Sequence, residues 1–241
     1  MLNIHSIETF GTHEGPGIRL VVFLQGCRLR CLYCHNPDTW ALNAGKPTSV
    51  DKILEQLDKQ KAYIQKKGGL TVSGGEPLIQ RKTLIDLFTR AQKLGYHTTL
   101  DTNGSILDED TKSLLNVTDL VLLDVKHINP DIHFKLTQST NNIVLQFAEY
   151  CEQNNKKMWL RYVLVPGWTD QETYLNEWGK TFRSYKHVER VEILPYHTLG
   201  VYKHKALGNE YKLNGISPPS HQQVSAAQSI FQQYFSNVFI R

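Results

Sequence analysis

The strongest constraint on the fold is an alternation between short apolar runs rich in β-branched residues and longer amphipathic stretches. This alternation is typical of βα units built around a parallel sheet. Six runs are predicted to be strands: residues 20–24, 70–73, 98–101, 120–124, 158–165 and 188–194. Apolar residues at helical spacing predict helices at 50–65 and 82–94, and a loop at 209–220 precedes a final helix and a short strand at 237–241.

Residues suited to chemistry follow or lie on each predicted strand. In chain order they are three clustered cysteines, Gly74-Gly75-Glu76, Asp101-Thr102-Asn103, Asp124 with Lys126, Arg161, and Tyr196-His197. Barrel enzymes collect their active-site residues at the carboxyl ends of parallel strands, so we expect these groups at one rim. With 241 residues the chain fits one large domain spanning residues 1–241, because single α/β barrel-like domains reach this size.

Composition and charge narrow the class of protein. The 27 Lys and Arg residues exceed the 23 Asp and Glu residues by only four, and both signs are interspersed along the chain, which argues against a nucleic-acid partner. The first residues have neither a basic region nor an apolar core of a signal peptide, and the longest apolar run, 20–24, is far shorter than a membrane span. We therefore expect a cytoplasmic protein with no membrane partner.

Three of the four cysteines, Cys27, Cys31 and Cys34, fall within eight positions. Such a loop of soft thiolates suits an iron-sulfur cluster or zinc. Three protein ligands leave one metal position open, which is unlike a closed structural zinc site. The loop at 27–34 is therefore predicted to hold one metal centre with an open position.

Other interpretations of the cysteines are possible from the residues alone. A structural zinc site would need a fourth ligand, either His35 or the distant Cys151. Cys31 and Cys34 alone could form a redox dithiol, although that chemistry needs no third thiol four residues earlier. Cys151 lies in a helical stretch and is most simply a buried free thiol.

The cysteine spacing, with an aromatic Tyr33 before the last cysteine, resembles the radical S-adenosylmethionine superfamily. Gly15-Pro16-Gly17-Ile18-Arg19, Phe23 and Asn36 extend this resemblance to the activating enzymes of glycyl radical enzymes. The segments at 165–168 and 194–200 are similar to members that act on pyruvate formate-lyase. No further cysteine follows Cys34 before Cys151, unlike relatives that carry a ferredoxin-like insert.

The resemblance implies a partial (β/α)6 barrel and a radical reaction. In this family three thiolates hold a [4Fe-4S] cluster whose open iron binds S-adenosylmethionine, and reductive cleavage gives a 5′-deoxyadenosyl radical that takes hydrogen from a glycine. The implied partners are the glycine loop of pyruvate formate-lyase and a flavodoxin or ferredoxin as electron donor. Alternatives are another glycyl radical enzyme or a small molecule as target, or a zinc-stabilised binding module.

The resemblance also implies roles for individual residues. The implied contacts to S-adenosylmethionine are Tyr33, Cys34, His35, Gly74, Gly75, Glu76, Asp124, Val125, Lys126, Arg161 and His197. For Arg161, an internal carboxylate is an alternative partner to the carboxylate of the cofactor. Asp101, Thr102 and Asp124 are implied ligands of a monovalent cation, although they could instead cap helices or loops. Glu14 stands where relatives carry an aspartate that helps to receive the glycine loop.

Overall fold

The computed structural model describes residues 1–64 and 68–241. The chain divides into two compact units, the first formed by residues 1–28 and 39–122 and the second by residues 29–38 and 123–241. Each unit has its own sheet segment, helices and buried core, and the two are described separately below. The expectation of a single domain over residues 1–241 stays a prediction.

The sheet of the first unit combines an antiparallel edge with a parallel centre. Its strands are β1 (Leu2–Gly11), β2 (Arg19–Leu24), β3 (Lys46–Thr48), β4 (Gly69–Gly74) and β5 (His97–Thr102). They lie in the order β3-β1-β2-β4-β5. Strand β1 pairs antiparallel with β2 and β3, whereas β2–β4 and β4–β5 are parallel. The predicted strands are confirmed, and β1 and β3 were not anticipated.

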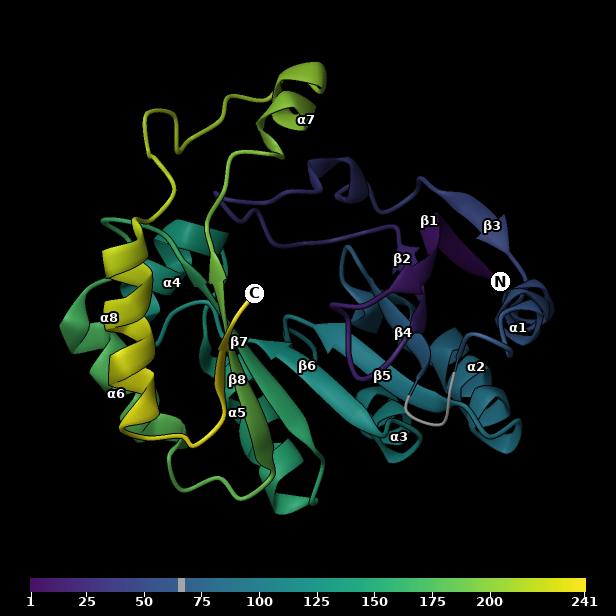
Figure 1. The fold of residues 1–241 in the computed structure, drawn as a ribbon. Helices are drawn as coiled ribbons and strands as arrows, with labels where there is room; N and C mark the ends of the chain where they lie inside the picture. Colours follow the sequence, from purple (N-terminus) through teal and green to yellow (C-terminus); the bar gives the residue numbers. More distant parts are fainter. Residues whose placement is uncertain (65–67) are drawn as a thin grey trace. The chain divides into compact units, whose positions relative to one another are not determined.

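The helices of the first unit pack in a row in which α2 contacts both α1 and α3 (Figure 1). Their bounds are α1 (Val50–Lys59), η2 (Pro77–Gln80), α2 (Arg81–Lys93) and α3 (Glu109–Asn116). Helix α1 is shorter than predicted, because residues 60–64 form turns and a bend after Lys59; residue 65 lies outside the described residues. Its first turn is capped by Ser49, whose side chain accepts the backbone N–H of Lys52.

The second unit contains three parallel neighbouring strands, β7 (Met158–Leu164), β8 (Val188–Pro195) and β9 (Val238–Ile240). The boundary between the units falls inside β6 (Leu120–Asp124). The helices of this part are α4 (Pro130–Thr137), α5 (Asn142–Gln153), α6 (Glu172–Phe182), α7 (Val201–Ala206) and α8 (His221–Gln232), with η1 (Pro37–Thr39) at the boundary. The predicted loop before α8 and the short terminal strand are confirmed.

Both units have buried apolar cores. Strand β2 buries Leu20, Val22 and Leu24 completely, as expected for a strand in the middle of a sheet with covered faces. In the second unit α6 packs beside α8 (Figure 1), and the ring centroid of Trp178 lies 4.9 Å from that of Phe231. These aromatic contacts fix α6 and α8 against the sheet of their own unit.

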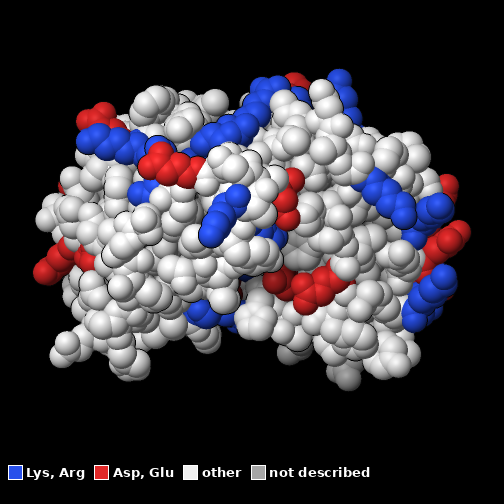
Figure 2. Space-filling model, turned by 90° about the horizontal axis from the view of Figure 1, so that it is seen from above, with Lys and Arg blue, Asp and Glu red and all other residues white. Residues whose placement is uncertain are grey.

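Charged side chains of both signs are mixed on the face seen in Figure 2. This distribution matches the interspersed charges of the sequence. Within the ranges that the structure describes, no helix has both the length and the apolar character needed to cross a membrane.

Candidate functional site

In the first unit, the ends of β2, β4 and β5 carry predicted site residues. These strands are parallel neighbours, so their carboxyl ends meet at one edge of the sheet. The backbone N–H of Glu76 donates to the carbonyl of Gly26 over 2.7 Å, and Ser73 Oγ donates to Asp101 Oδ2 over 2.8 Å. The structure therefore brings Gly74-Gly75-Glu76 and Asp101 together within this unit, as predicted.

Gly74, the last residue of β4, and Gly75, the next residue, lie where other backbone segments come too close for a Cβ atom. Gly74 has a φ of 111°, a conformation that side chains with a Cβ rarely adopt. A Cβ on Gly75 would lie 2.3 Å from the carbonyl oxygen of Gly26, one residue before Cys27. The glycines thus allow the end of β4 to rest on the backbone that leads into the cysteine loop. Their predicted contact with a ligand's amino group is not tested.

Glu76 ties the end of β4 to the end of β5. It is almost fully buried and accepts hydrogen bonds from Thr102 Oγ1 at 2.6 Å and from the backbone N–H groups of Asn103 and Leu78, both at 2.9 Å. Burial raises the pKa of Glu76 to about 7, and these donors limit the rise. The Thr102 hydroxyl, predicted as a cation ligand, also accepts the N–H of Gly104.

Cys27 is held close to this strand edge. Its backbone N–H donates to the carbonyl of Trp40 over 3.3 Å, and its sulfur lies 4.0 Å from the side-chain nitrogen Nδ2 of Asn103. A donor aimed at sulfur favours the thiolate form that metal ligation requires. Asn103 was grouped with Asp101 and Thr102 in the sequence, but its contact with Cys27 follows only from the fold.

Glu14 belongs to the loop between β1 and β2. Its side chain is half-buried, and Oε2 accepts the backbone N–H of His13 over 3.1 Å. The carbonyl of Glu14 accepts a hydrogen bond from the Thr71 hydroxyl at 2.6 Å. The loop is therefore attached to β4 through its backbone.

Cys31 and Cys34 belong to the second unit. The N–H of Cys34 donates to the carbonyl of Cys31 over 3.0 Å, which closes a turn, and Leu32 N–H donates to the carbonyl of Leu136 at the end of α4. Burial raises the pKa of the Cys31 thiol to about 12, against the lowering effect of Lys126. His204 Nε2 donates to the carbonyl of Cys34 over 2.8 Å, a contact that no sequence pattern indicated.

Lys126 and Asp124 form a partly buried ion pair at the end of β6. The Lys126 Nζ lies 2.8 Å from Asp124 Oδ2 and 5.6 Å from the centroid of the Tyr33 ring. Burial lowers the pKa of Lys126, but the acidic groups Asp124, Tyr33 and Cys31 raise it well above its ordinary value. Lys126 thus carries a positive charge beside Cys31. Val125 lies between Asp124 and Lys126 in the sequence, and its carbonyl accepts the indole N–H of Trp178 at 3.2 Å.

Arg161 on β7 is paired with an internal carboxylate, one of the two partners considered from the sequence. Its Nε donates to Glu192 Oε2 over 3.0 Å. Glu192 is fully buried on β8, and its other oxygen accepts from Arg190 and Arg241. A guanidinium has five N–H donors, so this ion pair and a ligand carboxylate are compatible in number of donors. Sequence reasoning missed Glu192.

His35 and His197 stack on each other. Their ring centroids are 3.9 Å apart with an interplanar angle of 25°, and His35 Nε2 donates to the carbonyl of His197 over 3.0 Å. Burial and the neighbouring His197 lower the pKa of His35. A Cβ on Gly200 would lie 2.6 Å from the Cα of His35, so the segment after β8 approaches the cysteine loop closely. The structure thus unites two predicted cofactor contacts.

The division into units passes through the cysteine loop. Cys27 belongs to the first unit, and Cys31 and Cys34 belong to the second. Among residues 1–64 and 68–241, no three His, Cys, Asp or Glu side chains are grouped as a metal site. The three-cysteine ligand set and the cation ligands therefore stay predictions. Cys151, by contrast, is confirmed as a buried free thiol on α5.

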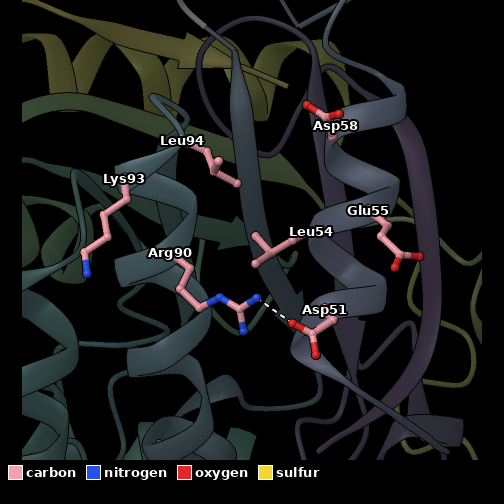
Figure 3. A pocket seen from close by; sticks show the side chains of 7 residues that line it. All are labelled: Asp51, Leu54, Glu55, Asp58, Arg90, Lys93 and Leu94. Atoms are coloured by element: carbon pink, nitrogen blue, oxygen red, sulfur yellow. Dashed lines mark hydrogen bonds and ion pairs between the residues drawn. The ribbon is translucent and has the colours of Figure 1, made fainter.

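A cavity of about 610 Å³ lies between α1 and α2, lined by Asp51, Leu54, Glu55, Asp58, Arg90, Lys93 and Leu94. Figure 3 shows Arg90 reaching across it to an ion pair with Asp51. None of its lining residues belongs to the predicted site. The cavity is therefore lined by other residues than the candidate site.

Comparisons with known proteins place the chain in a family. The family model described as the radical SAM superfamily, where SAM is S-adenosylmethionine, matches residues 21–175. The chain is 44% identical over 234 residues to pyruvate formate-lyase 1-activating enzyme of Escherichia coli K12, covering 96% of this chain and 95% of that protein. It is 43% identical over 236 residues to pyruvate formate-lyase-activating enzyme of Listeria monocytogenes, covering 95% of each chain.

A solved structure supports the fold. The crystal structure of a domain of pyruvate formate-lyase-activating enzyme from Bacteroides vulgatus matches with a TM-score of 0.62 and 23% identity, covering 72% of this chain and 99% of that chain. At this identity the match shows the fold alone. The fold class predicted from the sequence, an α/β fold with a sheet of parallel strands, is confirmed.

Proposed function

Because the chain belongs to the radical S-adenosylmethionine superfamily and, within it, to the pyruvate formate-lyase-activating enzymes, we propose that it generates a glycyl radical on a pyruvate formate-lyase. The observation that carries this proposal is the identity of 43–44% over about 95% of the chain to activating enzymes from two bacteria. The family uses a [4Fe-4S] cluster and S-adenosylmethionine, which matches the soft thiolates of the cysteine loop.

Cys27, Cys31 and Cys34 are proposed to hold the cluster. The fit rests on the donor set and on the anchoring of the loop at both ends: Asn103 lies near the sulfur of Cys27, and His204 holds the carbonyl of Cys34. When bound, the reduced cluster supplies the electron that cleaves S-adenosylmethionine, whose 5′-deoxyadenosyl fragment then takes a hydrogen atom from the target glycine. Burial raises the pKa of the Cys31 thiol, and the positive charge of Lys126 opposes that rise.

The other residues of the two units are proposed to bind and orient S-adenosylmethionine. The glycines after β4 present backbone carbonyls to its amino group, with Glu76 fixing that turn. The cations Arg161 and Lys126 attract its carboxylate, and their internal partners Glu192 and Asp124 hold them in place. The remaining predicted contacts, Tyr33, Cys34, His35, Val125 and His197, are proposed to form the adenosine side of the site.

Asp101, Thr102 and Asp124 are proposed to bind a monovalent cation through oxygen ligands. In support, Asp101 and Thr102 are side by side at the end of β5, and Asp124 ends β6. A flavodoxin or ferredoxin is proposed as the electron donor. Glu14 is proposed to contact the glycine loop of the partner.

The test is an anaerobic activation assay. Reconstituted protein, a chemical reductant and S-adenosylmethionine are mixed with pyruvate formate-lyase, and the glycyl radical is measured by electron spin resonance. We expect a radical signal that depends on all four components. An intact cluster without any signal would contradict the proposed substrate, and a stronger signal with another glycyl radical enzyme would reassign it. A colourless protein that contains zinc rather than iron and sulfide would reject radical chemistry altogether.

A further inference from the structure

Arg19, at the start of β2, has an unusually enclosed guanidinium. The residue is fully buried. Its N–H groups donate to the backbone carbonyls of Pro16 at 2.9 Å, Leu70 at 2.7 Å and His97 at 3.1 Å, and its Nε donates to the hydroxyl of Thr71. One side chain therefore connects β4 and β5 with the loop that precedes β2.

The loop that Arg19 supports is the one that carries Glu14. Thr71 links Arg19 to this loop, because its hydroxyl accepts a hydrogen bond from Arg19 Nε and donates one to the carbonyl of Glu14 over 2.6 Å. Gly15 has a φ of 125°, and a Cβ there would lie 3.0 Å from both Cδ and Nε of Arg19. The backbone of residues 14–16 thus rests directly on this guanidinium.

The enclosed guanidinium of Arg19 keeps its positive charge. Burial lowers the pKa of Arg19 to about 9, although the charges of Asp119 and Glu14 oppose the shift, so the side chain is still protonated at neutral pH. Lysine could not make the same contacts, because the planar fork of arginine presents its donors in fixed directions.

The carboxylate of Glu14 depends on this loop for its direction. Its Oε2 accepts the N–H of His13 and would lie 2.8 Å from a Cβ placed on Gly11, so the side chain lies against the backbone of the same loop. A shift of the backbone at residues 14–16 would therefore move the carboxylate. The loop that carries Glu14 is thus held by the contacts of Arg19.

We propose that Arg19 is a positioning residue for partner recognition, which fixes the loop at residues 14–16 so that Glu14 is presented to the glycine-bearing segment of the partner protein. This inference rests on the proposed function. It assigns Arg19 no contact with S-adenosylmethionine or with the reacting glycine; its effect passes through Glu14.

The kinetic test compares Arg19→Lys, Glu14→Gln and the double variant. Radical formation is measured against pyruvate formate-lyase concentration, and reductive cleavage of S-adenosylmethionine is measured without the partner. We expect each single variant to raise the KM for the partner about tenfold, as expected for the loss of a charge-assisted hydrogen bond. In Arg19→Lys, turnover at saturation and partner-free cleavage should stay within about twofold of the wild type.

The double variant separates positioning from simple stabilisation. If Arg19 acts through Glu14, the double variant should have the same KM as Glu14→Gln alone, because coupled residues are not additive. Multiplied effects in the double variant, or an unchanged KM with slower partner-free cleavage, would overturn the inference. Should Arg19→Lys fail to fold, Thr71→Val removes the link to Glu14, and an unchanged KM in that variant would likewise overturn it.

Hydrogen exchange provides a readout that needs no activity. Amides of residues 12–18 should exchange about tenfold faster in Arg19→Lys, because local opening becomes easier. The matched control is Arg81→Lys, since Arg81 is a half-buried arginine of the same unit that binds Asp108 and the carbonyl of Leu78. Equal exchange of residues 12–18 in both variants would contradict the anchoring. A wild-type protein that gives no radical would instead refute the proposed function, a distinct result.

Discussion

Glu192 is predicted to be the most sensitive charged residue of the second unit. Its carboxylate is fully buried and receives Nε of Arg161 and Nε of Arg241 at 3.0 Å each and a terminal nitrogen of Arg190 at 3.3 Å. Glu192→Gln removes the negative charge and leaves three guanidinium groups around a neutral amide. The rings of Trp159 and Phe239, 3.9 and 4.3 Å from the guanidinium of Arg190, would keep that cation in place.

The expected loss follows from burial. Breaking a buried ion pair by removing one partner costs about 3–5 kcal/mol, and the side chains of Arg190 and Arg241 remain 24% and 21% exposed, which favours the lower end of this range. A loss of about 3 kcal/mol lowers the melting temperature of a chain of this size by roughly 6–12 °C. Calorimetry or a thermal fluorescence scan of the reconstituted protein measures this shift.

The matched control for this prediction lies on the same strand. Glu189 pairs with Lys157 at 2.8 Å, but both side chains are exposed, by 42% and 60%. Glu189→Gln should therefore cost less than about 1 kcal/mol. If the two variants melt within about 2 °C of each other, the reasoning from burial is refuted.

Three further predictions concern the cysteines and two titratable groups. Cys31→Ala should abolish iron binding and activity, whereas Cys151→Ala should retain both. Iron and sulfide analysis measures the first property, and the radical assay measures the second. Equal behaviour of the two variants would reject this division of the cysteines. Burial and the nearby His133 lower the pKa of His127 to about 4, so the unfolded chain binds this proton first and stability falls as the pH drops below about 6.5. Between pH 7 and 5 the wild type should lose about 2 kcal/mol more than His127→Asn in urea unfolding, and parallel pH profiles would contradict this. Asp108→Ala removes the N-cap of α3 and should cost about 1 kcal/mol in the same assay; a loss below about 0.3 kcal/mol would contradict that role.

The sequence predicted strands β2, β4 and β6 well because each is an almost continuously buried run with apolar residues at its centre. Strand β6 agrees with the prediction at both ends, and the others differ by one or two residues. Strand β1 was missed because its alternation is weak: only Leu2, Ile4 and Gly11 are buried, and its register with β2 shifts after Ile4. Strand β3 is too short, at three residues, to give a periodic pattern.

From the residues alone, without the resemblance, the candidate site could be predicted only where residues are close in sequence. Spacing singles out Cys27, Cys31 and Cys34 as predicted metal ligands, and the turn at Gly74 and Gly75 followed from the glycines. The pairing of Arg161 with Glu192 depends on the register of β7 against β8, in which these two residues are directly opposed. Register between parallel strands is set by tertiary packing and by connections of many residues, so a single sequence does not reveal it.

The contacts of the loop ends were hidden for the same reason. His204 reaches the carbonyl of Cys34 from 170 positions away, and Asn103 reaches the sulfur of Cys27 from 76 positions away. Asn103 was grouped with Asp101 and Thr102 in the sequence without a contact to Cys27, and His204 was not singled out at all. Only the fold shows that they position the backbone and sulfur of the predicted metal ligands.

This chain is expected to transfer a hydrogen atom from a protein glycine to the 5′-deoxyadenosyl group of S-adenosylmethionine. The most direct test is to count both products in one anaerobic reaction: 5′-deoxyadenosine by chromatography and the glycyl radical by spin quantification. Once the cleavage measured without the partner is subtracted, the chemistry predicts equal amounts, since each coupled cleavage takes one hydrogen atom from the glycine. A radical formed without 5′-deoxyadenosine, or 5′-deoxyadenosine released with no radical on the partner, would contradict the account.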